Sequence, residues 1–380
     1  MRIAFVSTIL SFPWGGADTL WTRATEAAAA RGDRLMLSLS ALTAGHERIK
    51  TLVAGGAELH LRAPLPPFPP FTARLKRKLG LSVRPDSRLI AWLSAFSPDL
   101  VVFSQGGTYD LLQHRDLVGW LLENNIPFRL IANWQTEHPV LFDADLAFIR
   151  TTFAAADRLD FVSTRNLAVT RRHLLAPLAN ARVLHNPLRW QPADTSPWPA
   201  AAEARLATVS RLDPGKGIHL LLHALAEAAA DLPPWRLEIF GQGPQETLLR
   251  EIITHLGLSD RVVLRGHVGS LREIWSGNHL LCAPAIDDGV PMTIPEAMLC
   301  SRPVLSTCVG GAEDWIEHGR TGYLCPAATV PLLAASLRAA LADQTRWAEL
   351  GLAARAAALA RYRPDDYQSL IAPPHARLDS

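Results

Sequence analysis

The chain opens with RIAFVS (2–7), DTLWTRATEAAAARG (18–32) and DRLMLSLS (33–40). The first and third stretches are apolar runs of the length of buried strands, and the alanine-rich stretch between them has the length of a helix. A strand, a helix and a second strand in this order form the βαβ unit of a parallel sheet. A signal peptide is the alternative for the first run, but FPWGGAD (12–18) follows where a cleavage site would need small residues. We therefore expect residues 2–7 to form the first strand.

The same alternation of apolar runs and helical stretches continues along the chain and then restarts. The first half continues with LVVFSQ (100–105), FRLIANW (128–134) and RLDFVST (158–164). The second half contains LATVSRL (206–212), WRLEIFG (235–241), RVVLRG (261–266), HLLCAP (279–284) and PVLSTCV (303–309). A chain of 380 residues exceeds what one hydrophobic core usually serves. The pattern predicts an α/β protein with two doubly wound, Rossmann-like parallel-sheet domains.

The stretch 186–204, NPLRWQPADTSPWPAAAEA, is rich in proline, which neither a helix nor a central strand tolerates. We expect an N-terminal Rossmann-like domain over 1–187, a linker over 188–204 and a C-terminal Rossmann-like domain over 205–355. A helix and tail over 356–380 are expected to cross back to the N-terminal domain. Doubly wound sheets bind ligands at the carboxyl ends of their strands, so the two domains should face a central cleft lined by strand-to-helix loops.

The composition excludes several classes of protein. Lys and Arg number 38 against 36 Asp and Glu, a balance that argues against a nucleic-acid partner. Cys282, Cys300, Cys308 and Cys325 have neither metal-ligand nor redox-pair spacing, and we expect reduced core residues. No apolar stretch approaches the ~20 residues that cross a bilayer. We expect a soluble, cytoplasmic protein, with peripheral association at the inner face of a membrane left open.

The loop after the first strand of the second domain reads VSRLDPGKG (209–217), in which Arg211 and Lys216 flank a glycine turn before an apolar helix. Two cations beside a helix N-terminus suit a diphosphate, which needs fixed positive charge and backbone N–H donors. A solvated turn at the start of a helix is the alternative for this loop taken by itself.

The stretch LLCAPAIDDGVPMTIPEAMLCSRPVLSTCVGG (280–311) places a strand, an acidic turn, a helix, a strand and a double glycine in order. Together with VSRLDPGKG, IFGQGPQETL (239–248) and GGAD (15–18), it resembles the family 4 glycosyltransferases of GT-B fold. The resemblance runs from the first strand to about residue 360. It is strongest over 205–325 and weak across the middle of the first domain. It implies a metal-independent enzyme that moves a sugar from a UDP- or GDP-sugar with retention of anomeric configuration.

The hallmark of that family is a pair of glutamates separated by seven residues, and Asp288 and Glu296 occupy the two positions here. The resemblance implies that Glu296 binds the donor ribose, for which a carboxylate is suited because it accepts two hydrogen bonds from a vicinal diol. It implies that the first carboxylate contacts the transferred sugar. This chain departs from the pattern with Asp288, one methylene shorter, and the neighbouring Asp287 is a competitor for that contact.

The residues between the two carboxylates are expected to begin a helix whose amides face the diphosphate as its charge grows. With Arg211 and Lys216, this helix end would stabilise the leaving group in place of a divalent cation, so no metal or cofactor is expected. The resemblance assigns donor binding there to five residues: Gly289, Val290, Pro291, Met292 and Thr293.

Two further loops of the second domain are expected near the nucleotide. Gly241 and Gly243 follow a strand and resemble half of a dinucleotide fingerprint, but Glu246 stands where the third glycine belongs, which argues against NAD. Within the resemblance this loop borders the nucleotide. Gly266 and His267 correspond to the turn whose backbone meets the base, and His267 itself is better explained as a loop residue than as a catalyst.

In the first domain, Gly15 and Gly16 follow the first strand, and the resemblance places this turn over the donor phosphates and the acceptor. A bare tight turn is the alternative. The alternative for Asp18, two residues after Gly16, is that it caps the next helix and binds no ligand. The stretch NWQTEHPV (133–140) ends another strand, and the family often places a histidine there against the donor sugar. His138 is our candidate, with a structural histidine as the alternative.

Two charged features of the first domain have simpler interpretations. Asp143 and Asp145 spell the pattern of metal-using transferases, but they lead into a helical stretch, and we interpret them as N-terminal helix charges. The segment 64–85 combines prolines and phenylalanines with a basic run: Arg74, Lys76, Arg77 and Lys78. This run is a candidate for peripheral membrane contact, with a solvated basic helix face as the alternative.

These observations predict a retaining glycosyltransferase whose acceptor is a hydroxyl of a glycan, a lipid-linked sugar or a small-molecule glycoside. The alternative is a GT-B relative that binds a nucleotide sugar but is inactive, or that hydrolyses or epimerises it. The catalytic candidates are Arg211, Lys216, Asp288 and His138. The sequence leaves the sugar, the acceptor and the oligomeric state open.

Overall fold

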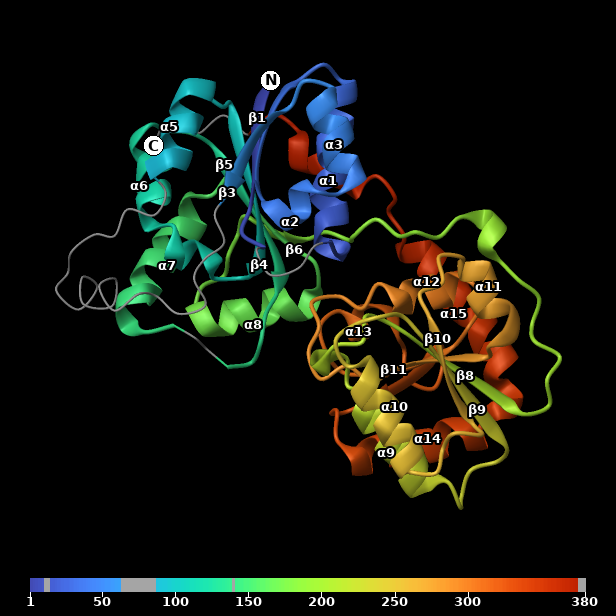
Figure 1. Ribbon diagram of the computed structural model, residues 1–380. Coiled ribbons are helices and arrows are strands. Elements are labelled where there is room, and N and C mark those ends of the chain that lie inside the picture. The colour runs from blue at the N-terminus through green and yellow to red at the C-terminus, as the bar shows by residue number, and fades with distance from the viewer. Residues whose placement is uncertain (10–13, 63–86, 139–140, 375–380) are drawn as a thin grey trace. The chain divides into compact units, whose positions relative to one another are not determined.

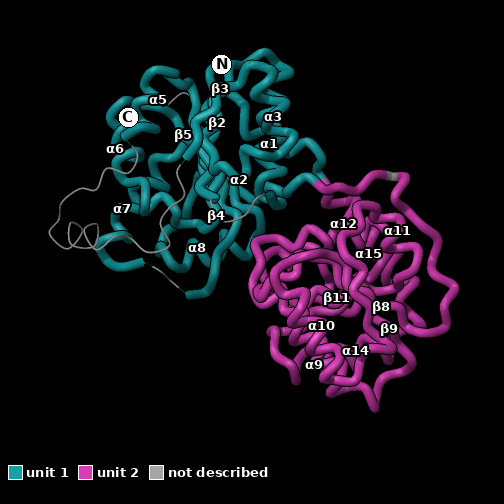
Figure 2. Tube along the Cα trace, viewed as in Figure 1, with its two compact units in different colours: residues 1–187, 363–380 teal, residues 188–362 magenta. Residues whose placement is uncertain are grey.

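The computed structural model describes residues 1–9, 14–62, 87–138 and 141–374. The chain divides into two compact units, unit 1 with residues 1–187 and 363–380 and unit 2 with residues 188–362 (Figure 2). Each unit contains a parallel sheet with helices on both faces (Figure 1). The prediction of two parallel-sheet α/β domains is therefore confirmed.

The described part of unit 1 contains a seven-stranded sheet in which all neighbouring strands pair in parallel. Its order is β3 (Glu58–Arg62), β2 (Arg34–Ser40), β1 (Arg2–Ser7), β4 (Leu100–Gly107), β5 (Phe128–Trp134), β6 (Arg158–Phe161) and β7 (Ala181–Val183). The direction of the strand order reverses between β1 and β4. This switch point is where a doubly wound sheet leaves room for a ligand.

Helices cover both faces of this sheet because its central strands are apolar on both sides. One face forms a core with α5 (Ser87–Phe96), α6 (Arg115–Glu123), α7 (Asp143–Ala155) and α8 (Thr164–Leu174). Figure 1 shows α1 (Gly16–Ala30) and α3 (Glu47–Ala54) on the opposite side. The short helices α2 (Ala41–Ala44) and η1 (Asp110–Gln113) follow β2 and β4.

Unit 2 contains a six-stranded parallel sheet. Its order is β10 (Val262–Gly266), β9 (Trp235–Phe240), β8 (Ala204–Val209), β11 (Leu280–Ala283), β12 (Val304–Thr307) and β13 (Gly322–Cys325). One face packs against α9 (Ile218–Ala228), α10 (Glu246–His255) and α14 (Val330–Ala342). The other packs against α11 (Leu271–Gly277), α12 (Thr293–Leu299), α13 (Ala312–Trp315) and α15 (Trp347–Arg361). The switch point lies between β8 and β11.

The proline-rich segment expected as a linker, 188–204, packs on unit 2. Arg302, 1% exposed, donates hydrogen bonds to the carbonyls of Pro197 (2.8 Å), Trp275 (2.5 Å) and Asn278 (2.9 Å). Its guanidinium also lies over the ring of Trp198, 5.1 Å from the centroid. These carbonyl contacts satisfy a buried cation and hold the segment against the sheet of unit 2.

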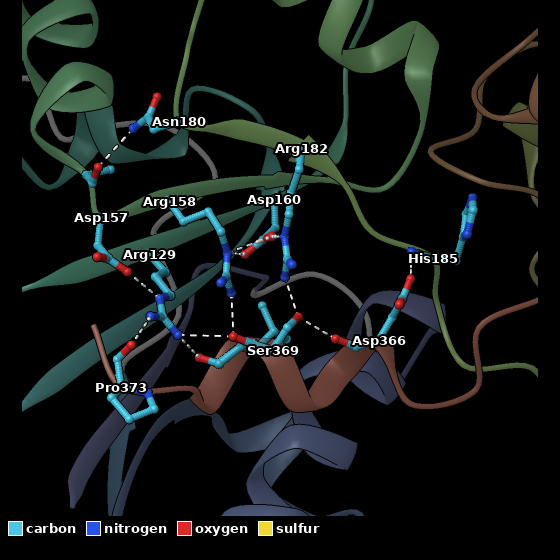
Figure 3. Close-up of polar contacts among 12 residues, drawn as sticks. Arg129, Asp157, Arg158, Asp160, Asn180, Arg182, His185, Asp366, Ser369 and Pro373 are labelled. Atoms are coloured by element: carbon cyan, nitrogen blue, oxygen red, sulfur yellow. Dashed lines mark hydrogen bonds and ion pairs between the residues drawn. The ribbon is translucent and has the colours of Figure 1, made fainter. Parts of the chain in front are cut away.

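Arginines fasten the C-terminal segment, which contains η5 (Asp366–Ile371), to unit 1 (Figure 3). The fully buried Arg129 on β5 donates to the carbonyls of Ser369 (3.1 Å) and Pro373 (3.2 Å). Arg158 on β6 donates to the same Ser369 carbonyl at 2.6 Å. The described end of the chain therefore belongs to unit 1, which also contains the N-terminus.

The strands predicted from apolar runs are confirmed, and three strands that the sequence did not reveal are β3, β7 and β13. Asp143 and Asp145 lie in the first turn of α7, as predicted, and Asp145 pairs with Arg115. Three of the cysteines are buried and unpaired, whereas Cys308 is only partly buried. The basic run Arg74–Lys78 lies outside the described residues. Within those residues no helix has the length and apolar character needed to cross a membrane.

Candidate functional site

The switch point of unit 2 brings together the loops that follow β8 and β11. The carbonyl of Gly215 accepts hydrogen bonds from the amides of Ile286 (2.8 Å) and Asp287 (3.1 Å). Gly217 directly precedes α9 with φ +64°, and a Cβ there would lie 2.0 Å from the carbonyl oxygen of Pro284. A side chain at residue 217 would therefore push the two loops apart, so glycine is required.

This loop contact places Lys216 beside Asp288. The Nζ of Lys216 lies 2.5 Å from Oδ2 of Asp288, and the two side chains are 27% and 15% exposed. Arg211 instead pairs with Asp213 of its own loop. The structure thus brings Lys216 of one motif against Asp288 of another at the carboxyl ends of β8 and β11, while Arg211 lies in the same loop as Lys216.

Three glycines let the neighbouring loops approach this site closely. A Cβ on Gly241 (φ +137°) would lie 1.8 Å from the carbonyl oxygen of Ser210, and one on Gly243 would lie 2.6 Å from that of Leu212. A Cβ on Gly310 would lie 2.4 Å from the carbonyl oxygen of Gly289. Glycine at positions 241 and 243 therefore has a structural role, because only a residue without a side chain allows the loop after β9 to pack this closely on the loop after β8.

The loop after β10 lies next to the loop after β9. Gly266 ends β10 with φ +70°, and its carbonyl accepts a hydrogen bond from the amide of Gly241 at 2.7 Å. His267 follows with an exposed side chain. Gly266 therefore connects two of the loops that the sequence assigned to the nucleotide.

Glu296 lies in the first turn of α12 and is 2% exposed. Its Oε1 accepts hydrogen bonds from the backbone N (3.3 Å) and Nε (3.1 Å) of Arg189, and its Oε2 accepts one from Nη2 (3.0 Å). These hydrogen bonds, with the charge of Glu296, raise the pKa of Arg189. Arg189 was not identified from the sequence, because 107 residues separate it from its partner.

The first five of the seven residues between the carboxylates lead into α12 as expected. Thr293 is the first residue of the helix, and the amide of Ile294 bonds to the carbonyl of Pro291 at 3.0 Å. Pro291 is buried, whereas Gly289, Val290, Met292 and Thr293 are partly exposed. The first amides of a helix lack partners within it, and they form the positive end of its dipole.

In unit 1 the glycine turn after β1 is tied to α1 by Asp18. Gly16 begins the helix, and Asp18, 1% exposed, accepts a hydrogen bond from the amide of Gly15 at 2.9 Å. Burial raises the pKa of Asp18 to about 6, and the hydrogen bonds from Trp21 and Gly15 lower it in part. The helix-cap interpretation of Asp18 is therefore confirmed.

His138 is exposed in the loop after β5, where its carbonyl accepts a hydrogen bond from Oγ1 of Thr136 at 3.2 Å. The adjacent Glu137 pairs with Arg165 (2.9 Å) and Arg172 (2.7 Å) of α8. This carboxylate connects the loop that carries His138 to α8.

Asp110 is a partly buried carboxyl group that the sequence did not single out. It lies at the switch point of the unit 1 sheet and accepts hydrogen bonds from Oγ1 of Thr8 (2.5 Å) and the amides of Gly106 (3.0 Å) and Gly107 (3.2 Å). Burial raises its pKa. The glycine pair that precedes Asp110, at the end of a predicted strand, was the signal available in the sequence.

Comparison with known proteins finds a family match within unit 2 and relatives that match about a third of the chain. A profile of the family described as "Glycosyl transferases group 1" matches residues 203–343. The chain is 36% identical over 136 residues to an exopolysaccharide phosphotransferase of Streptomyces coelicolor, covering 35% of this chain and 14% of that protein. It is 34% identical over 125 residues to the GtfA subunit of a UDP-N-acetylglucosamine–peptide N-acetylglucosaminyltransferase of Streptococcus pneumoniae, covering 33% and 25%. The chain thus spans a quarter or less of both relatives.

A solved structure matches both units. The chain superposes on HepE of Anabaena in complex with UDP with a TM-score of 0.72 at 20% identity, covering 98% of each chain. The UDP-glucose complex of the same protein gives a TM-score of 0.69 with the same coverage. At this identity the likeness shows a shared fold.

Proposed function

We propose that this chain transfers a sugar from a UDP- or GDP-sugar to a hydroxyl acceptor with retention of anomeric configuration. The match of residues 203–343 to the group 1 glycosyltransferases and the fold shared with HepE support this proposal. The observation that carries the proposal is the ion pair of Lys216 with Asp288 at the switch point of unit 2, with Arg211 in the same loop as Lys216. Doubly wound sheets bind nucleotides at such a point. A diphosphate also needs the two cations found there.

In the proposed reaction the bond between the anomeric carbon and the diphosphate oxygen breaks while the acceptor oxygen bonds to that carbon on the same face. The acceptor proton passes to the departing phosphate oxygen. Arg211, Lys216 and the amides that begin α12 neutralise the charge that develops on the diphosphate. Glu296 binds the ribose. Backbone atoms around Gly266 and His267 face the base.

Lys216 and Asp288 exchange partners in this proposal. In the free protein Asp288 neutralises the ammonium group at 2.5 Å. Donor binding brings the diphosphate to Lys216, and the released carboxylate accepts a hydrogen bond from a hydroxyl of the sugar. Partly exposed ion pairs are worth at most about 1 kcal/mol, so this exchange costs little.

A UDP-sugar is the donor that the relatives favour. The fold neighbour from Anabaena was crystallised with UDP and with UDP-glucose, and the streptococcal relative is named for a UDP-sugar donor. The acceptor side is proposed for unit 1, with the turn of Gly15 and Gly16 and with His138 against the donor sugar. A glycan, a lipid-linked sugar or a small glycoside is the acceptor class, and we propose a cytoplasmic location with contact to the inner face of a membrane as the variant to test.

The test begins with a thermal-shift screen against UDP-, GDP- and ADP-sugars. A ligand at 100 times its dissociation constant raises the folding free energy by about 2.7 kcal/mol, which gives a measurable shift. The product anomer formed on a panel of acceptors is then followed by NMR. An inverted product contradicts the proposed stereochemistry. Activity that a chelator abolishes and manganese restores contradicts the proposed role of Arg211 and Lys216. Donor binding without turnover favours the inactive relative.

A further inference from the structure

Glu296 has fewer free acceptor sites than a ribose diol needs. A carboxylate offers about four lone-pair positions, two on each oxygen. Arg189 uses three of them, because its backbone N and Nε both donate to Oε1 and its Nη2 donates to Oε2. One position on Oε2 is left for a ligand. Two adjacent hydroxyl groups that both donate to the carboxylate would need two.

We propose that Arg189 is a positioning residue that fixes the carboxylate of Glu296 and leaves it one acceptor site, so that the donor is recognised through a single ribose hydroxyl. This inference rests on the proposed function, since it assumes that Glu296 meets the ribose. The inference gives a role to Arg189, which lies outside both carboxylate motifs. It also defines how the nucleoside part of the donor is recognised.

The surroundings of Arg189 hold its backbone in place. Leu188 is 9% exposed in the core of unit 2, and Trp190 packs edge-on against Tyr362 with ring centroids 6.3 Å apart. Arg189 therefore lies between two anchored neighbours. A backbone donor held in this way cannot rotate away from Oε1 as a side chain can, so the occupied positions on that oxygen are preorganised.

The geometry of the pair also distinguishes orientation from simple charge neutralisation. Glu296 has a side chain that is 3% exposed, whereas the Arg189 side chain is 49% exposed. The planar guanidinium contacts both carboxylate oxygens and so fixes the plane of the carboxylate, which a lysine ammonium group cannot do. The orientation of Glu296 therefore depends on the fork of Arg189 and not only on its charge.

The position of Arg189 next to the unit boundary adds a second consequence. The chain passes from unit 1 to unit 2 at residues 187 and 188, and it returns at residues 362 and 363. The Trp190–Tyr362 contact brings these two crossings together within unit 2. The residue that orients the ribose-binding carboxylate is thus joined directly to the point where the units connect.

The experiment is a cycle that combines protein variants with nucleotide analogues, measured by titration calorimetry on the full chain. Wild type, Arg189→Gln and Arg189→Lys are each titrated with UDP, 2′-deoxy-UDP and 3′-deoxy-UDP. In wild type we expect one of the two deoxy analogues to bind about 10-fold more weakly than UDP, the size expected for one hydrogen bond to a charged group, and the other to bind within about 3-fold. In both variants we expect UDP to bind about 10-fold more weakly and the deoxy penalty to fall below about 3-fold.

Arg236→Gln is the matched control, because Arg236 is an exposed arginine of β9 in unit 2 whose partner is Glu203 at 3.2 Å. We expect it to bind all three nucleotides as wild type does. Thermal unfolding of each variant checks that the fold is retained.

The outcomes separate this inference from the proposed function. If wild type binds neither UDP nor GDP, the proposed function fails and the inference fails with it. If wild type binds UDP and both deoxy analogues are weakened equally, or if Arg189→Gln keeps the wild-type penalty, the role of Arg189 is refuted while the proposed function stands. An Arg189→Lys variant that retains the full penalty would show that charge alone is sufficient and would also refute the inference.

Discussion

Replacing Lys216 by Met should separate the catalytic from the structural effect of its cation. The Nζ of Lys216 contacts a carboxylate that is 15% exposed, and the lysine side chain itself is 27% exposed. Ion pairs with this degree of exposure contribute at most about 1 kcal/mol to folding. For a domain of 150–250 residues that corresponds to a melting-temperature decrease of about 2–4 °C.

The expected effect on the reaction is much larger. If Lys216 stabilises the departing diphosphate, its removal costs about 2.7–4 kcal/mol of transition-state stabilisation, or ~10²- to 10³-fold in kcat. The assay is release of the nucleoside diphosphate from the donor that the thermal-shift screen identifies, measured with the acceptor and in its absence. The melting temperature of the same preparation is measured alongside, with Arg236→Gln as the control for a lost surface ion pair in unit 2.

A second variant tests whether Lys216 acts together with Asp288. Groups in direct contact have effects that do not add, so Lys216→Met combined with Asp288→Ala should cost less than the sum of the two single substitutions. If Lys216→Met lowers kcat by less than 3-fold, or if its loss of activity follows a loss of folding, the proposed stabilisation of the leaving group is wrong.

Three further predictions concern stability. Burial raises the pKa of Asp18 from 3.8 to about 6, so the protonated side chain favours the folded state. This stabilisation is present below pH 3.8 and is lost as the pH rises through 6. Urea unfolding from pH 4 to 7.5 should show a loss of about 3 kcal/mol in the free energy of unfolding relative to Asp18→Asn, and parallel curves would contradict this. Gly241→Ala should lower the free energy of unfolding by about 3 kcal/mol, since its Cβ would lie 1.8 Å from the carbonyl oxygen of Ser210 at φ +137°; an unchanged urea midpoint would show that the loop shifts without cost. Asp157→Ala removes the carboxylate 2.6 Å from the buried Arg129 and should cost about 3–5 kcal/mol, whereas an effect below 1 kcal/mol would mean that the C-terminal carbonyls satisfy the cation alone.

Several of the predicted strands are continuously apolar because they are buried, whereas the edge strand β10, which is buried only at Val262, was predicted from the apolar run RVVLRG. FRLIANW corresponds to β5, which is buried at all but its last residue. The three missed strands, β3, β7 and β13, lie at sheet edges. The five residues of β3, ELHLR, are mostly part-exposed, and β7 has only three residues. An edge strand has a neighbouring strand on one edge only, so it needs fewer apolar residues and its apolar pattern in the sequence is weaker.

The candidate site was predictable where a motif is local and unpredictable where a contact is distant. Lys216 and Asp288 were both chosen from their own loops, but their pairing follows from the parallel contact of β8 and β11. Arg189 lies in a proline-rich stretch that predicts only a linker, and its side chain acquires a role when the chain packs on α12. Such a contact leaves no spacing pattern.

Under the proposed function, the ion pairs of unit 2 would keep the site ready for an anionic donor. Arg211, Lys216 and Arg189 pair with Asp213, Asp288 and Glu296, and the cationic side chains are 38%, 27% and 49% exposed. Charges that remain partly solvated are held in place at little cost, and they can change partners without the large penalty of a buried unpaired charge. A diphosphate that displaces Asp288 from Lys216 converts a neutral pair into a cation facing the leaving group and a carboxylate facing the sugar. The fork of Arg189 on Glu296 is different, because its backbone donor cannot be exchanged, so that pair is expected to persist when the donor binds.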